Sequence, residues 1–298
     1  MGASIVACVS ACGTREAAIT ANMWGKSGVR DGEFIRPRAM GATDTELYVI
    51  DTSGRVQVFS HDGKHLRGWH MPEHSNGTPT GITFASDGRI IIPDTHYSRI
   101  MEFTAQGELI TKWGEYGTGE TQFIYPTDIT LGPNGEYFFT EYGVDAERLH
   151  AFDAQRKFLR QWGKHGDQPN EFSRAMSLAI VKDKLYVADT ANHRVQCFAL
   201  DGTLSHVIGG LGSEPGKLKF PHDIARAPDD TLIICEYGNN RISRFACDGK
   251  FIAAFGKPGR HYGEFNTPRG VTVSPQGTVF VADTDNNRIQ RFRLEDIA

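Results

Sequence analysis

A five-residue pattern that begins with arginine and ends with phenylalanine recurs six times along the chain. The copies occupy residues 55–59, 99–103, 148–152, 194–198, 241–245 and 288–292. Consecutive phenylalanines lie 44, 49, 46, 47 and 47 residues apart. Self-similarity at roughly 20–50 residues is typical of folds in which each repeat is one supersecondary unit that packs on its neighbours.

Each repeat contains four segments with the pattern of short β-strands. The arginine follows an alternating apolar segment that ends in an acid, namely Asp51, Asp94, Glu141, Asp189, Glu236 or Asp283. Another apolar segment lies upstream, and Asp-Gly turns such as Asp62-Gly63 lead to a fourth segment. Hairpin turns of this kind favour antiparallel pairing. The sequence therefore predicts an all-β fold, a six-bladed β-propeller of four-stranded antiparallel blades.

The two ends of the chain complement each other. The sixth repeat stops at Ala298 without a fourth strand, whereas residues 19–25 carry a fourth-strand pattern without a repeat of their own. Trp24 lies 45 residues before Trp69, so it is in phase with the other repeats. We expect the N-terminal strand to complete the last blade, which removes an open sheet edge. The predicted propeller spans residues 19–298, and we expect a monomer.

Residues 187–196 read Val-Ala-Asp-Thr-Ala-Asn-His-Arg-Val-Gln, and residues 281–290 read Val-Ala-Asp-Thr-Asp-Asn-Asn-Arg-Ile-Gln. Both segments resemble the signature of the NHL repeat family, and the resemblance extends over roughly residues 19–298. Blades 1 and 3 match less well because their turns differ in length. The resemblance implies a six-bladed propeller.

Residues 1–18 resemble a lipoprotein leader and tether. Val9-Ser10-Ala11-Cys12-Gly13 is similar to a bacterial lipobox, which implies a lipid anchor at Cys12 and a place in the cell envelope or periplasm. No Lys or Arg precedes this motif, and the apolar stretch is short for a signal peptide. The alternative is a disordered N-terminal tail.

The overall charge bears on the class of partner. The formal net charge is −4, and the sequence pI is about 6.3. Proteins that bind nucleic acid by neutralising phosphates are usually basic, so we expect no nucleic-acid partner. This includes the RNA binding known for some animal members of the family.

Residues that differ between blades are the candidates for function, because those shared by all six are most simply scaffold. Aligned at the start of the innermost strand, the six blades carry Arg38, Thr80, Thr127, Arg174, His222 and Arg269. The arginines and the histidine predict a basic arc at one mouth of the central channel. Such an arc suits a small anionic ligand, such as a carboxylate or a phosphate. Alternatively, these arginines pair with the repeated acids.

The loops between the second and third strands are expected to open on the same face. Tyr142 and Tyr237 lie there in matching Glu-Tyr-Gly triplets, and His96, His193 and Asn239 lie in equivalent loops. Polar and aromatic groups that converge on a channel mouth are typical of small-molecule sites. We predict an extracytoplasmic module that binds a small anionic ligand or a protein partner through Arg38, Arg174, His222, Arg269, Tyr142 and Tyr237.

Catalysis in the channel is the alternative, as a metal-dependent lyase. Residues 220–224, Phe-Pro-His-Asp-Ile, resemble the strand start of the peptidyl-hydroxyglycine amidating lyases. In that family three channel histidines hold zinc, and an acid beside one of them supports calcium. Only His222 and Asp223 match, so the resemblance implies these two as metal ligands but leaves the three-histidine set incomplete.

A calcium-dependent lactonase or esterase is a further alternative. That class needs acids that face the channel, because Ca²⁺ prefers oxygen ligands. Asp128 and Asp223 follow the strand-start position directly, and Glu141 and Glu236 belong to the Glu-Tyr-Gly blades. Alternatively, the two aspartates cap local turns.

Overall fold

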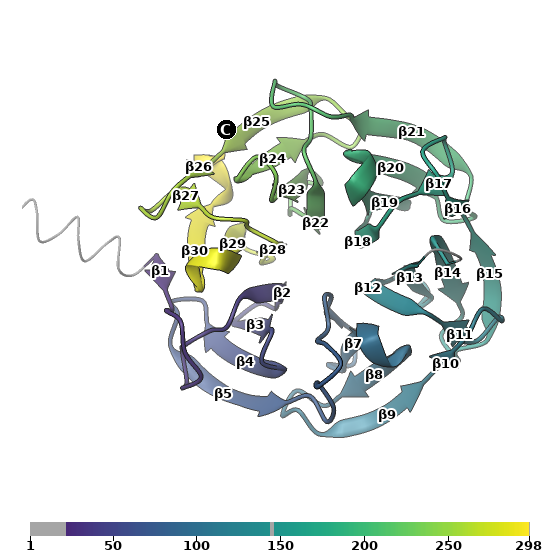
Figure 1. Cartoon of the computed structure of the whole chain (residues 1–298), viewed down its shortest axis with the longest axis horizontal. Helices are drawn as coiled ribbons and strands as arrows, with labels where there is room; N and C mark the ends of the chain where they lie inside the picture. Colours follow the sequence, from purple (N-terminus) through teal and green to yellow (C-terminus); the bar gives the residue numbers. More distant parts are fainter. Residues whose placement is uncertain (1–21, 144–145, 298) are drawn as a thin grey trace, which may run out of the picture.

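The alternating segments of each repeat form the strands that their pattern predicts. The structure, a computed structural model, describes residues 22–143 and 146–297. These residues form six four-stranded antiparallel sheets arranged around a central axis (Figure 1). The prediction of an all-β, six-bladed propeller is confirmed. The predicted leader, residues 1–18 with Cys12, lies outside the described residues.

In blades 1 to 5 the strands run from the channel to the rim in sequence order, whereas in blade 6 the outermost strand comes from the start of the chain (Figure 1). Blade 1 comprises β2 (Pro37–Ala42), β3 (Glu46–Asp51), β4 (Arg55–Ser60) and β5 (His65–His70). Blade 2 comprises β6 (Thr83–Phe84), β7 (Ile90–Asp94), β8 (Arg99–Phe103) and β9 (Leu109–Trp113). Blade 3 comprises β12 (Tyr125–Leu131), β13 (Tyr137–Tyr142), β14 (Arg148–Phe152) and β15 (Phe158–Trp162).

The remaining blades follow the same plan. Blade 4 comprises β18 (Ala175–Val181), β19 (Lys184–Asp189), β20 (Arg194–Ala199) and β21 (Leu204–Gly209). Blade 5 comprises β22 (Pro221–Arg226), β23 (Leu232–Glu236), β24 (Arg241–Phe245) and β25 (Phe251–Phe255). Blade 6 comprises β28 (Gly270–Val273), β29 (Thr278–Asp283), β30 (Arg288–Arg293) and, from the start of the chain, β1 (Met23–Trp24).

Short elements occupy the connections. Three parallel two-stranded pairs are β10 (Glu115–Tyr116) with β11 (Gln122–Phe123), β16 (Lys164–His165) with β17 (Glu171–Phe172), and β26 (Lys257–Pro258) with β27 (Glu264–Phe265). The 3₁₀ turns are η1 (Thr95–Tyr97), η2 (Thr190–Asn192), η3 (Thr284–Asn286) and η4 (Leu294–Asp296). Over the described ranges, no helix has the length and hydropathy needed to cross a bilayer.

The N-terminal strand closes the ring as predicted. β1 pairs antiparallel with β30, with Trp24 opposite Ile289, so the first and last parts of the described chain lie side by side (Figure 1). The backbone N–H of Arg291 donates to the carbonyl of Asn22 at 2.8 Å. The Arg291 guanidinium also donates to Asn22 Oδ1 at 2.8 and 3.0 Å and to the carbonyl of His61 in blade 1 at 2.7 Å. Closure therefore joins blades 6 and 1.

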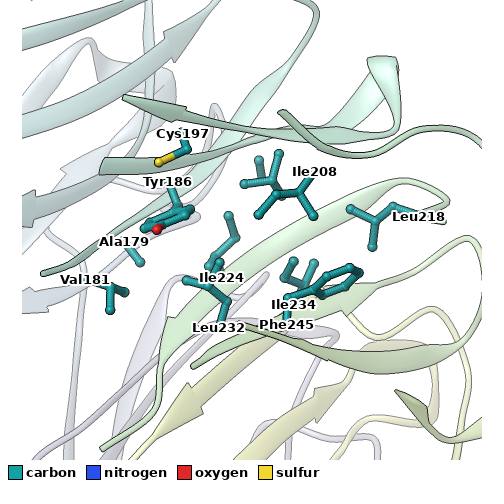
Figure 2. Packing of buried hydrophobic residues seen from close by; sticks show 12 residues of the cluster. Ala179, Val181, Tyr186, Cys197, Ile208, Leu218, Ile224, Leu232, Ile234 and Phe245 are labelled. Carbon is teal, nitrogen blue, oxygen red and sulfur yellow. The ribbon is translucent and has the colours of Figure 1, made fainter. Parts of the chain in front are cut away.

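Apolar side chains fill the spaces between neighbouring blades. Figure 2 shows one such cluster, in which Tyr186 and Ile208 of blade 4 lie beside Ile224 and Phe245 of blade 5. The repeated tryptophans follow one rule, because each packs on the repeated phenylalanine of the next blade. The pairs are Trp24–Phe59, Trp69–Phe103, Trp113–Phe152 and Trp162–Phe198, with ring centroids 5.2–6.2 Å apart. Aromatic pairs at this separation add to the stabilisation that comes from burial.

The acid and the arginine present in all six blades form an ion pair across each central hairpin. In blade 6, Arg288 Nε donates to Asp283 Oδ2 at 2.6 Å, and both side chains are buried. Arg288 also donates to the carbonyls of His261 and Glu264. Asp283 accepts the backbone N–H of Asn266 at 2.7 Å. These charge-assisted bonds hold the connection that leads into the innermost strand.

Candidate functional site

A cavity of about 290 Å³ lies at one mouth of the channel, where the innermost strands begin; we call it the mouth cavity. Its wall combines cationic, aromatic and hydroxyl side chains: Arg38, Thr80, Thr95, His96, Tyr142, Arg174, Met176, Thr190, His222, Tyr237 and Arg269. All six residues that the sequence predicts as ligand-binding belong to this wall. Sequence reasoning missed Thr95, Met176 and Thr190.

The sequence alignment of the six blades is out of register in blade 4. Arg174, which it aligned with His222, nevertheless lines the mouth cavity. Ala175 occupies the ladder position that Pro221 holds in blade 5. Met176 is therefore the counterpart of His222, and Arg174 precedes the strand in a turn with φ of 58°. A proline marks this position in the other blades, and its replacement by Ala175 removes the signal that sets the alignment.

The three arginines of the mouth cavity differ from the six scaffold arginines in their partners. Each scaffold arginine is paired with an acid of its own blade. Among the described residues, Arg38, Arg174 and Arg269 have no carboxylate within ion-pair distance, and Arg269 Nε is buried without a hydrogen-bond partner. In the part of the chain that the structure describes, these arginines therefore do not pair with the repeated acids, which was the alternative.

Burial and the neighbouring arginines change the ionisation of groups in the cavity. Burial, followed by the nearby guanidiniums of Arg269 and Arg36, lowers the pKa of Arg38 from 12.5 to about 10. Burial is also the largest cause of the lowered pKa of Arg269. For His222, burial and then Arg269 and Arg38 lower the pKa to about 3, so this imidazole is neutral at physiological pH. His222 can therefore offer a hydrogen bond but not a positive charge.

Two of the arginines lie over tyrosine rings. The Arg174 guanidinium is 5.4 Å from the ring centroid of Tyr142, which stacks on Tyr125 with centroids 5.2 Å apart. The Arg269 guanidinium is 5.2 Å from the centroid of Tyr237. We call Tyr125 with Tyr142 the blade-3 clamp and Phe220 with Tyr237 the blade-5 clamp. Cation–π contacts and stacking restrict where each guanidinium can lie.

The clamps arise from paired sequence changes in two of the six blades. In blades 1, 2, 4 and 6 a threonine follows the repeated acid, and in blade 4 Thr190 Oγ1 donates to the carbonyl of Pro221 at 2.6 Å. In blades 3 and 5 that threonine is replaced by Tyr142 or Tyr237. The same two blades carry an aromatic residue before the strand proline, and Phe220 stacks on Tyr237 with centroids 5.0 Å apart.

Further along the channel, Ser177 bridges two carboxyl groups. Its Oγ lies 2.8 Å from Asp128 Oδ2 and 2.7 Å from Asp223 Oδ1. Burial, followed by the nearby Asp128, raises the pKa of Asp223 to about 8, and burial raises the pKa of Asp128 to about 6. A hydroxyl has one hydrogen to donate, so one contact must use a proton of the carboxyl. The pair therefore retains a proton at neutral pH.

These two aspartates join blades and do not simply cap local turns. Asp128 of blade 3 accepts the backbone N–H of Leu178 in blade 4 at 3.0 Å. Asp223 of blade 5 accepts the N–H of Val271 in blade 6 at 2.7 Å. Since each carboxyl satisfies a backbone donor of the next innermost strand, both are part of the scaffold of the channel.

The residues proposed as metal ligands do not come together. His222 lines the mouth cavity, whereas Asp223 lines a separate cavity of about 200 Å³ that also includes Asp128. Glu141 and Glu236 are each bound to the arginine of their own hairpin. Across residues 22–143 and 146–297 no three His, Cys, Asp or Glu side chains form a cluster suited to a metal. The residues present fit neither a zinc centre with three protein ligands nor an oxygen-rich calcium site.

The other loop residues have separate roles. His96 lines the mouth cavity. His193 Nδ1 accepts the backbone N–H of Phe220 at 3.0 Å, and Asn239 donates to Glu236 Oε2 and to the carbonyl of Gly212. His193 and Asn239 therefore support the strand starts that carry the site.

The ring of six four-stranded blades defines the class of protein as a six-bladed β-propeller. Residues 172–198, 218–245 and 265–292 match the NHL repeat, which identifies blades 4, 5 and 6 as NHL repeats. Three of the six blades therefore match NHL repeats, and the chain has distant similarity to amidating enzymes.

Two relatives illustrate that similarity. The chain is 26% identical over 183 residues to the peptidylglycine α-amidating monooxygenase of Rattus norvegicus, a match that covers 57% of this chain and 18% of that protein. It is 30% identical over 129 residues to a probable peptidyl-α-hydroxyglycine α-amidating lyase of Caenorhabditis elegans, covering 41% of this chain and 37% of the relative. The matched part is therefore a minor portion of each relative's length.

Solved structures share the fold. A Bacteroides thetaiotaomicron protein of unknown function has a TM-score of 0.72 at 13% identity, covering 91% of this chain and 75% of that chain. The virginiamycin B lyase of Staphylococcus aureus has a TM-score of 0.61 at 15% identity, covering 92% and 96%. At these identities the likeness concerns the fold alone.

Proposed function

We propose that the chain is a binding module for a small anionic ligand, which occupies the mouth cavity. The observation that supports this most is the set of three guanidiniums without a carboxylate partner among the described residues. Arg38 and Arg269 are partly buried and Arg174 is exposed; a partly desolvated cation without a partner is unfavourable, and an anion from solution would stabilise it. Arginine binds carboxylates and phosphates in a bidentate manner, so both are suitable groups.

Binding is supported better than catalysis. A lyase or a lactonase-type hydrolase in the channel would need metal ligands or a base, and the pKa of about 3 makes His222 a weak proton acceptor at neutral pH. The similarity to the two amidating relatives covers 57% and 41% of this chain, respectively. A protein partner remains compatible with the proposal if it inserts an acidic side chain into the cavity.

Replacing Arg174 and Arg269 together with alanine is expected to weaken anion binding by at least about tenfold, since each charge-assisted contact contributes about 1.5–3 kcal/mol. The melting temperature in anion-poor buffer is expected to change by less than about 2 °C, because neither guanidinium holds a scaffold acid. Calorimetric titration with sulfate and thermal unfolding measure the two quantities.

The matched control is Arg226→Ala, whose guanidinium pairs with Asp230 away from the mouth cavity. It should leave sulfate binding unchanged. A large loss of stability in the double variant, with sulfate affinity intact, would instead assign Arg174 and Arg269 to the scaffold.

We further propose that the protein acts outside the cytoplasm and carries a lipid on Cys12. The intact mass of protein made in bacteria with its native upstream sequence tests this. A soluble product with unmodified Cys12 would contradict it.

A further inference from the structure

We infer that the ligand carries two separate anionic groups, as in a compact dicarboxylate, with one group at Arg38 and Arg269 and the other at Arg174. This inference rests on the proposed function, since it specifies the ligand of the same mouth cavity. It concerns the number and spacing of negative charges, which the proposal of an anion site leaves open.

The number of positive charges in the cavity favours a ligand with more than one negative charge. Three guanidiniums line the cavity, and His222 is neutral there. A ligand with a single negative charge would leave two guanidiniums without a counter-charge in a confined volume. Like charges that line one cavity repel one another, so a ligand with more than one negative charge fits better.

The arginines that line the cavity come from strands on two sides of the channel. Arg38 is the second residue of β2, and Arg269 directly precedes β28. The two arginines therefore come from the adjacent blades 1 and 6. Arg174 directly precedes β18 and lies over Tyr142 at the end of β13. Figure 1 shows β2 and β28 on one side of the channel and β12 and β18 on the other. Two of the cavity's arginines therefore come from strands on one side of the channel, and the third comes from the other side.

The electrostatic neighbours of His222 agree with this division. Arg269 and Arg38 depress the pKa of His222 more than Arg174 does, as expected if the first two arginines are nearer to the imidazole. His222 can then add a neutral hydrogen bond at the Arg38–Arg269 side.

The two clamps fix the distance between the anion-binding groups. Arg174 lies on the blade-3 clamp and Arg269 on the blade-5 clamp. Because each guanidinium has a preferred position over its ring, we expect ligands of one particular length to bind best. Met176 gives the wall an apolar side chain, which suits a short methylene linker. The cavity volume of about 290 Å³ lies at the lower end of the range for small-molecule sites, which suits a compact ligand.

Titration calorimetry with matched ligands tests the inference. Succinate and glutarate are compared with succinamate and glutaramate, which keep the size but replace one carboxylate with a neutral amide. At least one dicarboxylate is expected to bind about tenfold or more tightly than its monoamide, the effect of one charged contact. Sulfate, which places both charges on one centre, is expected to bind less tightly than that dicarboxylate.

A single variant assigns the groups to their sites. Arg174→Gln is expected to lower the affinity for the dicarboxylate about tenfold and to leave that of its monoamide within about twofold, because the remaining carboxylate binds Arg38 and Arg269. The control is Arg160→Gln, which also removes a guanidinium from an aromatic surface but lies over Phe138 and Trp162, away from the cavity. It should change neither affinity.

The outcomes separate this inference from the proposed function. Equal affinities for each diacid and its monoamide, or sulfate binding at least as tightly as the diacids, would overturn the two-group ligand while the anion site stands. Absence of binding for every anion, with the protein folded, would overturn both.

Discussion

Replacing Asp283 with alanine is expected to lower the free energy of unfolding by about 3–5 kcal/mol, because it leaves the buried Arg288 without its counter-charge. The carboxylate also accepts hydrogen bonds from the backbone N–H of Asn266 and from the side chains of Asn286 and Gln290. All of these donors lose a partner together. Urea unfolding of the purified variant measures the effect.

Asp285 provides a control in the same loop. It pairs at 3.0 Å with the half-exposed Arg36, which directly precedes β2. Exposed ion pairs contribute about 0–1 kcal/mol, so Asp285→Ala should be nearly neutral. Equal effects of the two substitutions would show that the repeated acid does not hold the blade.

Removing residues 1–25 is expected to destabilise the ring by more than about 3 kcal/mol, the lower end of the cost of truncating a packed tryptophan. The truncation deletes β1, and with it the contacts of Trp24 with Phe59 and Phe280. It also removes Asn22, to which the Arg291 guanidinium donates. The outer edge of β30 then becomes an unpaired strand, which favours association between molecules.

The reference for this experiment is a truncation of residues 1–21, which retains Asn22 and the whole of β1. Urea unfolding gives the difference in stability, and size-exclusion chromatography reports association. If the shorter chain proved monomeric and as stable as the reference, closure of blade 6 by β1 would not contribute as described.

Blade number and ring closure were predictable because both depend on periodic local signals. Each blade repeats the same strand lengths, turns and aromatic positions, and Trp24 keeps the phase of the repeat into blade 6. The repeated acid and arginine could also be identified as scaffold from their presence in all six copies. Such signals survive in one sequence because every repeat packs on an equivalent neighbour.

Contacts that break the repeat were harder to predict from the sequence. The register of blade 4 failed where Ala175 replaces a proline, so Met176 was missed. The bridge from Asp128 through Ser177 to Asp223 joins three blades, and no local pattern marks it. Its distances depend on how the innermost strands pack around the axis. The structure supplies that information, whereas strand periodicity does not.

The aromatic clamps could be predicted only in part from the sequence. Tyr142 and Tyr237 stood out because they lie in matching Glu-Tyr-Gly triplets, but their stacking partners did not. An aromatic residue before the strand proline occurs in the same two blades, at Tyr125 and Phe220. Comparing the blades for paired departures, rather than single ones, would have found both clamps.

The central claim is that the unpaired guanidiniums of the mouth cavity hold an anion from solution. Anomalous diffraction from crystals soaked in selenate tests it most directly, because selenium marks the position of a sulfate-like anion. The account predicts a selenium peak in the mouth cavity, within hydrogen-bond distance of the Arg38 and Arg269 guanidiniums. A cavity without selenium, in which these arginines pair with carboxylates of their own chain, would contradict it.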